Sequence, residues 1–142
     1  MSTSRGRRGA APGPADRRRA RERALDLLYE AELKGVAPTS VLDALPSTPD
    51  PFATELVRGV DRALDVIDPL IAKHAEGWEL GRLPAVDRQL LRIATFELLE
   101  RADVTQAVVI DEAVELAKQF STAASGAYVN GVLSAIAAEV RG

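Results

Sequence analysis

Cysteine is absent from the 142-residue chain, which excludes disulfides, thiolate metal sites and thiol catalysis. His74 is the single histidine, so the sequence indicates neither a multi-histidine metal site nor another cofactor. No apolar run approaches the roughly 20 residues that span a membrane. The basic amino terminus is not followed by the apolar stretch of a signal peptide. We therefore expect a cytoplasmic protein without a membrane segment.

Aromatic residues are also scarce, at 4% of the chain, so the core must be built mainly from aliphatic side chains. A length of 142 residues suits one domain with a real core better than two. The hydrophobic share of 46% and the charged share of 27% are ordinary for a globular protein. The composition thus predicts a single globular domain.

The formal net charge of −3 conceals an asymmetry along the chain. Residues 1–23 carry eight arginines against two acidic residues, whereas the remainder carries ten basic and nineteen acidic residues. Residues 1–15 show no periodicity, which predicts a disordered basic arm ahead of a helical domain over residues 16–142. A basic front on an acidic body indicates an anionic partner at one end of the molecule.

Helical signals follow one another through the first half of the domain. Asp16 can cap a helix that runs to about Lys34, and Gly35 is a natural end. A brief helix is expected between the prolines at 38 and 46. Asp50 then caps a third helix, with proline at its first position. Because Pro69 cannot lie in one smooth helix, we expect a break near Asp65.

The second half is also helical by its pattern. Trp78 lies in a turn-rich connector, and "PAVDRQLLRIATFELLE" then forms a helix that is apolar nearly all round, as a central helix should be. The segments "VTQAVVIDEAVELAKQF" and "YVNGVLSAIAAEV" are expected to be helices as well, although the first contains a β-branched run. The sequence therefore predicts an all-α, single-domain bundle of about seven helices.

An enzyme requires a constellation of catalytic side chains, and the sequence offers none. Asp111, Glu112 and Glu115 lie close together on one predicted helix, but acidic residues in this arrangement are typical of a solvated helix face. The glycines follow neither the P-loop nor the dinucleotide-binding spacing. We therefore expect a protein that is not an enzyme.

Arginines gather at the start of the first predicted helix, at positions 17, 18, 19, 21 and 23. Two neighbouring acidic residues cannot pair with all five, and a helix dipole disfavours cations at this end. The run enters an ordered amphipathic helix, so a scaffold holds the charges. This pattern favours binding of single-stranded RNA, whereas the alternative is a merely solubilising tail.

Four segments stand out by their order and spacing: "RRRARERALDLLYEAEL", "GWELGRLPAVDRQLLRIATFELLE", "VVIDEAVELAKQFS" and "YVNGVLSAIA". Together they resemble the NusB family of bacterial transcription antitermination factors. The resemblance covers nearly everything from residue 16 to residue 140. It implies an all-helical protein that pairs with the ribosomal protein NusE, binds the single-stranded boxA element of ribosomal RNA leaders, and helps RNA polymerase to read through terminators.

The resemblance also implies functional residues. The arginine-rich start of the first helix would contact RNA, as would the aromatic residue before "VNG" and its polar neighbours. The implied RNA-binding residues are Arg17, Arg18, Arg19, Arg21, Ser125, Tyr128 and Asn130. The face for NusE would include Tyr29 and Asp87, with Arg92 and Glu97 supporting the packing or the contacts of the central helix.

The chain departs from the family pattern in one segment. Many relatives read D-S-x-x-F-V-N-G, whereas this chain has Ala124 in place of the acidic residue and Tyr128 in place of phenylalanine. A polar RNA contact or a helix cap is therefore expected to be missing.

Two alternative functions remain open at this stage. A NusB-like domain also precedes ribosomal RNA cytosine methyltransferases, but 142 residues leave no room for a cofactor-binding domain. The other alternative is a protein-interaction module, such as a homodimer that masks the arginines.

Overall fold

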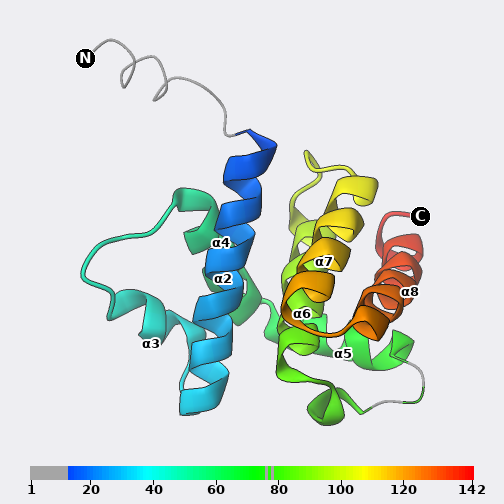
Figure 1. The fold of residues 1–142 in the computed structure, drawn as a ribbon, viewed down its shortest axis with the longest axis horizontal. Helices are drawn as coiled ribbons and strands as arrows, with labels where there is room; N and C mark the ends of the chain where they lie inside the picture. The colour runs from blue at the N-terminus through cyan, green and yellow to red at the C-terminus, as the bar shows by residue number, and fades with distance from the viewer. Residues whose placement is uncertain (1–12, 76, 78) are drawn as a thin grey trace.

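A computed structural model describes residues 13–75, 77 and 79–142 of the chain (Figure 1). The expected arm is therefore described only from residue 13 onward, and Trp78 lies outside the described residues. Within this part there is no strand, and the all-α prediction of about seven helices is confirmed. The elements are α2 (Pro14–Lys34), α3 (Pro38–Asp43), α4 (Pro51–Arg62), α5 (Leu64–His74), the 3₁₀ turn η1 (Leu80–Arg82), α6 (Ala85–Glu100), α7 (Gln106–Phe120) and α8 (Ala123–Val140).

Helix α2 begins two residues before the expected cap. It starts at Pro14, and Asp16 lies within the first turn, where its carboxylate accepts a hydrogen bond of 3.3 Å from the Gly13 N–H. The helix ends as expected at Gly35, which adopts a left-handed φ of 66°. This conformation strains other residues but not glycine.

The boundary between α4 and α5 shows where local signals suffice and where they do not. Asp50 caps α4 as predicted, because its Oδ1 accepts hydrogen bonds from the backbone N–H groups of residues 52 (2.8 Å) and 53 (3.3 Å). The break lies at Ala63, which confirms the expected break near Asp65, but Pro69 lies inside α5 and does not interrupt it. Asp65 and Pro69 are both exposed, so solvent can replace the hydrogen bond that proline cannot make.

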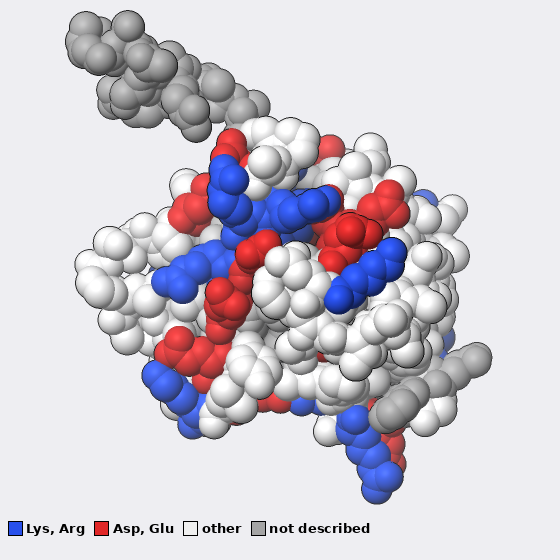
Figure 2. Space-filling view, viewed as in Figure 1, with Lys and Arg blue, Asp and Glu red and all other residues white. Residues whose placement is uncertain are grey.

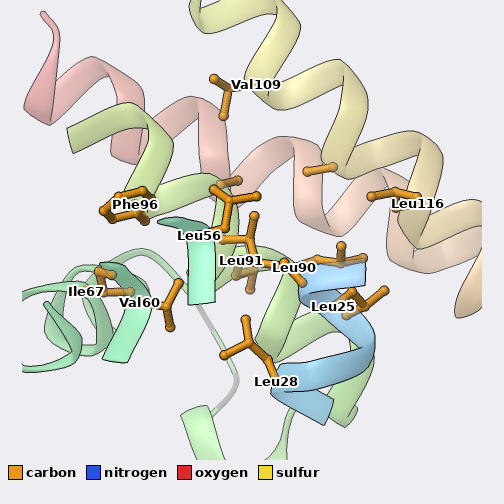
Figure 3. Packing of buried hydrophobic residues seen from close by; sticks show 14 of the residues in the cluster. Leu25, Leu28, Leu56, Val60, Ile67, Leu90, Leu91, Phe96, Val109 and Leu116 are labelled. Carbon is orange, nitrogen blue, oxygen red and sulfur yellow. The ribbon is translucent and has the colours of Figure 1, made fainter. Parts of the chain in front are cut away.

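Helix α6 is the centre of the bundle, as its apolar circumference predicts. It packs against α2, α4, α5, α7 and α8. Its buried side chains include Leu90, Leu91 and Phe96, which meet Leu56 of α4 in the core (Figure 3). Apart from two phenylalanines, the buried hydrophobic side chains of the described residues are aliphatic, as the composition requires.

Gly59 allows α4 to approach this central helix closely. A Cβ atom added to Gly59 would lie 2.2 Å from the ring of Phe96, which is almost completely buried. No side chain fits in that space unless the ring moves. The glycine therefore sets the distance between α4 and α6.

Arg141 closes the carboxyl end of α6. Its guanidinium donates hydrogen bonds to the backbone carbonyls of Glu97 (3.1 Å), Leu98 (2.9 Å), Arg101 (2.9 Å) and Val104 (2.8 Å). Carbonyls at a helix end lack hydrogen-bond partners within the helix. Arg141, which directly follows α8, supplies donors for these groups. None of the described helices combines the length and hydrophobicity needed to cross a lipid bilayer.

Candidate functional site

The start of α2 carries basic side chains next to acidic ones. Figure 2 shows Lys and Arg interleaved with Asp and Glu over the first turns of α2 and the neighbouring α7. The structure brings the arginines together, as the sequence predicts, but it also brings carboxylates from distant segments to them. The surface is therefore much less basic than residues 1–23 alone suggest.

Arg18 and Glu112 form a forked ion pair between α2 and α7. Arg18 Nε donates to Glu112 Oε1 at 2.8 Å, and Nη2 donates to Oε2 at 2.6 Å. The Arg18 side chain is 46% exposed, whereas that of Glu112 is only 16% exposed. The hydrogen bonds from Arg18 lower the pKa of Glu112 against the opposing effect of burial. Glu112 therefore carries its charge at neutral pH.

Arg21 points into the protein and not toward solvent. Its Nε and Nη2 donate to Glu97 at 2.8 and 2.7 Å, and both side chains are almost completely buried. The guanidinium carbon also lies 5.3 Å from the ring centre of Phe52. The expected RNA contact of Arg21 does not fit this position, because a phosphate cannot reach a buried pair. Glu97 likewise acts in packing and not on an exposed partner face.

The remaining arginines of the first turns lie nearer the surface. Arg17 is 3.7 Å from the carboxylate of Asp103 and lies over the Phe52 ring, with its guanidinium carbon 5.1 Å from the ring centre. Arg19 pairs with Asp16 one turn earlier. Arg23 is exposed and forms no ion pair with any residue that the structure describes.

Asp103 and Arg101 complete the charged surroundings of Phe52. Arg101 donates two hydrogen bonds of 2.9 Å to Asp103, and these are the main cause that lowers the pKa of Asp103 to about 2. The Arg101 guanidinium carbon lies 4.9 Å from the Phe52 ring centre. Cations bind the faces of aromatic rings favourably, so Phe52 and Asp103 together hold this end of the arginine cluster.

Ser125, Tyr128 and Asn130 lie at the start of α8, away from the arginines. In Figure 1 the first turns of α2 lie at the top of the view, whereas the start of α8 lies lower, after the end of α7 that is farther from them. Ser125 is buried, and its hydroxyl donates to Asp87 Oδ2 at 2.8 Å. Asn130 is exposed, and its Oδ1 accepts a 3.2 Å hydrogen bond from the Ser134 hydroxyl. The predicted RNA residues thus form two groups and not one.

Asp87 belongs to the group at α8 and not to an exposed partner face. Its side chain is only 3% exposed, which does not fit the expected direct contact with NusE. Burial, and then the charge of Asp87, raise the pKa of the half-buried Tyr128. A mostly apolar pocket of about 340 Å³ opens here, lined by Leu83, Pro84, Asp87, Thr122, Ala124, Ser125 and Tyr128.

The departure at Ala124 does not remove a helix cap. Thr122 precedes α8, and its Oγ1 accepts a 3.2 Å hydrogen bond from the Ser125 N–H. This is the usual geometry of a threonine cap. The missing acidic side chain therefore changes the charge at the start of α8 while the helix end stays capped.

Tyr29 is exposed on α2, and the sequence reasoning missed its apolar neighbours. Tyr29 is 37% exposed, Leu33 68% and Val36 44%. The spacing of Tyr29 and Leu33 places them on one face of the helix, which is the signal that could have identified the patch. Arg92, by contrast, is mostly buried and donates to both oxygens of Asp68 at 2.9 and 2.8 Å, so it ties α6 to α5.

The acidic residues of α7 do not all lie on a solvated helix face, although the sequence predicts that they do. Glu115 is exposed and lies 3.5 Å from Lys118, as expected for a solvated face, but Glu112 faces α2. Among the described residues, no three acidic or histidine side chains gather as a metal site would require.

Comparison with known proteins identifies the relatives of this fold. The model of the NusB family matches residues 18–138. The transcription antitermination protein NusB of Salinispora tropica is 50% identical over 128 residues, which are 85% of this chain and 94% of that protein. A structure of T. maritima NusB is 41% identical, with a TM-score of 0.78, and the match covers 87% of this chain and 91% of that one.

A second solved structure shows a relative with its partners. It contains the antitermination factors NusB and NusE in complex with double-stranded RNA. The matched chain is 31% identical with a TM-score of 0.74, and the match covers 87% of this chain and 96% of that one. The resemblance seen in the sequence motifs is thus confirmed in both sequence and fold, and the chain belongs to the NusB family.

Proposed function

We propose that this protein is a transcription antitermination factor that binds the boxA element of ribosomal RNA leaders together with NusE, and that the complex lets RNA polymerase read through terminators. Its S. tropica relative carries the name of a transcription antitermination protein, and a relative of known structure binds NusE and RNA. Within this chain, the observation that carries the proposal is the arginine cluster held on the first turns of α2.

The cluster has the properties of a phosphate-binding surface. Arg18, Arg19 and Arg23 are exposed, and Arg17 is partly exposed. Helix α2 is anchored below them by the buried pair of Arg21, so the charges do not move as a loose tail would. Guanidinium groups match phosphate geometry because they donate two hydrogen bonds in one plane.

The start of α8 supplies a second contact for the same RNA. Tyr128 presents a partly exposed ring on which a base can stack, and Asn130 presents an exposed amide. Ser125 contributes indirectly, because its hydroxyl is bonded to Asp87 and helps to fix the turn before Tyr128. Single-stranded RNA would bridge the two groups, with phosphates at α2 and bases at α8.

NusE is proposed to bind the apolar patch of Tyr29, Leu33 and Val36. Exposed aromatic and aliphatic side chains are typical of protein interfaces and are costly to leave in water. Because the patch lies at the other end of α2 from the arginines, one helix can contact both RNA and protein. The competing possibility, a homodimer that masks the arginines, predicts a doubled mass in solution without NusE.

The proposal is tested by binding to a fluorescent single-stranded boxA RNA in a salt series. Arg17, Arg18 and Arg19 predict a slope of log K against log salt of about −2.1, at about −0.7 per phosphate for single strands. R18A and R19A should each weaken binding, whereas R58A, which removes an exposed arginine from α4, should not. Binding without salt dependence, or unchanged in R18A and R19A, would refute the proposed RNA surface.

A further inference from the structure

We infer that Glu112 limits the RNA affinity of the arginine cluster, because its carboxylate occupies Arg18 where a phosphate would bind. The inference rests on the proposed RNA-binding function and names a residue that sets its strength. RNA would have to compete for Arg18 with a carboxylate of the protein itself. Glu112 thus becomes a determinant of which anions the surface accepts.

The geometry of the pair is that of an anion already bound. Both oxygens of Glu112 accept from Arg18, at 2.8 and 2.6 Å, in the parallel arrangement that phosphate also uses. Glu112 Oε1 lies in addition 3.9 Å from Arg21 Nη1. The carboxylate therefore sits between two guanidiniums of α2, at the edge of the proposed phosphate-binding surface.

Neutralisation of this kind extends through the cluster. Each of the four arginines predicted to bind RNA has a carboxylate within 4 Å: Arg17 with Asp103, Arg18 with Glu112, Arg19 with Asp16, and Arg21 with Glu97. Only Arg23, among the arginines of α2 that the structure describes, lacks such a partner. The net charge that an approaching RNA meets is consequently small.

Glu112 differs from the other surface carboxylates because it cannot swing away. Its side chain is 16% exposed, whereas those of Asp16 and Asp103 are 43% and 57% exposed. An exposed carboxylate can turn into water when RNA arrives, and salt screens it. Glu112 remains close to Arg18 on the rigid helix α7 and continues to repel an incoming phosphate.

This arrangement favours a phosphate chain over an isolated anion. A single carboxylate or a small anion gains nothing by replacing Glu112, since the interaction it would make already exists within the protein. An RNA strand contacts several arginines at once, and the combined attraction can overcome one competing carboxylate. The pair therefore selects for closely spaced phosphates.

Glu112→Gln tests the inference, because glutamine keeps the size of the side chain and one oxygen acceptor for Arg18 while it loses the charge and the second acceptor. We expect E112Q to bind single-stranded boxA RNA about two- to fivefold more tightly, the range of a partly exposed ion pair. The salt slope should stay close to that of the wild type, because Arg18 is already one of the three arginines counted in the wild-type slope. E112A should also tighten binding, which shows that the effect does not depend on the glutamine side chain.

E115Q is the matched control, because Glu115 lies one turn further along α7, is exposed and pairs with Lys118. It removes the same charge without releasing Arg18, and its effect should be clearly smaller. In an R18A background, E112Q should lose most of its effect on RNA affinity, because Glu112 and RNA no longer compete for Arg18. Circular dichroism and urea unfolding establish that each variant is folded.

The outcomes separate this inference from the proposed function. If wild-type binding ignores salt and survives R18A and R19A, the RNA surface itself is wrong. If R18A weakens wild-type binding while folded E112Q and E112A bind no more tightly than wild type, the surface stands and the inference about Glu112 is overturned. Glu112 would then position Arg18 for RNA and would not compete with it.

Discussion

Replacement of Arg21 by alanine should cost far more stability than any other arginine substitution in the first turns of α2. The change leaves the carboxylate of Glu97, only 1% exposed, without the two hydrogen bonds of 2.8 and 2.7 Å that satisfy it. Breaking a buried ion pair from one side costs about 3–5 kcal/mol. Loss of the contact between Arg21 and the Phe52 ring adds about 0.5–2 kcal/mol.

Urea unfolding followed by circular dichroism measures this cost. Since domains of this kind are stable by about 5–15 kcal/mol, R21A should remain folded in water but unfold at a much lower urea concentration. R23A is the control, because Arg23 is exposed and its loss should change the free energy of unfolding by less than about 0.5 kcal/mol. R21M/E97M, which removes both charges, should recover most of the loss.

Two results would refute this account of Arg21. If R21A and R23A unfold at the same urea concentration while R21A loses affinity for RNA, Arg21 faces RNA and the buried pair is wrong. If R21M/E97M is no more stable than R21A, the cost does not arise from an uncompensated charge.

Further predictions concern packing and ionisation. Gly59→Ala should lower the free energy of unfolding by about 1–3 kcal/mol, because the added methyl group overpacks the core. Gly131→Ala should raise it by up to about 1 kcal/mol, because its methyl group meets open space and alanine favours a helix. Equal urea midpoints for the two variants would contradict this geometry. Hydrogen bonds from Arg88 are the first cause that lowers the pKa of Glu32 in the folded protein. Ionised Glu32 therefore stabilises the fold above its ordinary pKa, and this contribution is lost as the pH falls through the lower pKa of the folded state. Glu32→Gln should therefore flatten the loss of stability in acid, and an unchanged pH profile would exclude this role. The pKa of Tyr128 should lie above that of an ordinary tyrosine, as measured by ultraviolet titration of a Tyr29→Phe variant. Asp87→Asn should lower this pKa, and an unchanged pKa would show that the Asp87 carboxylate does not act on the Tyr128 hydroxyl.

The fold was largely predictable because its signals are local. Asp50 and the proline after it start α4 through contacts within four residues, and Gly35 ends α2 through its own backbone conformation. The apolar circumference of α6 likewise follows from its own residues. The break at Ala63 lies close to the predicted position, although Pro69, which suggested it, is exposed and tolerated inside α5.

The candidate site was less predictable because its decisive contacts join distant segments. Arg21 and Glu97 are 76 positions apart, and Arg18 and Glu112 are 94 apart. A helical projection of α2 alone cannot tell which arginine meets a carboxylate from another helix. The same limit applies to Asp87, whose carboxylate accepts a hydrogen bond from Ser125, 38 positions away at the start of α8.

The sequence nevertheless indicated where charged side chains gather. Arginines at the start of an ordered helix predicted a charged surface there, and that surface exists with one arginine turned inward. The sequence could not show which carboxylates pair with these arginines. The difference matters for function, because affinity depends on the net charge and not on the number of arginines.

The central claim is that the arginine cluster of α2 binds single-stranded RNA as part of a complex with NusE. It is tested most directly by the affinity of the full chain for a boxA oligonucleotide, measured with and without NusE, for the wild type and for R18A. We predict salt-dependent binding that tightens when NusE is added and weakens in R18A under both conditions. An affinity that NusE leaves unchanged and that R18A does not reduce would contradict the account.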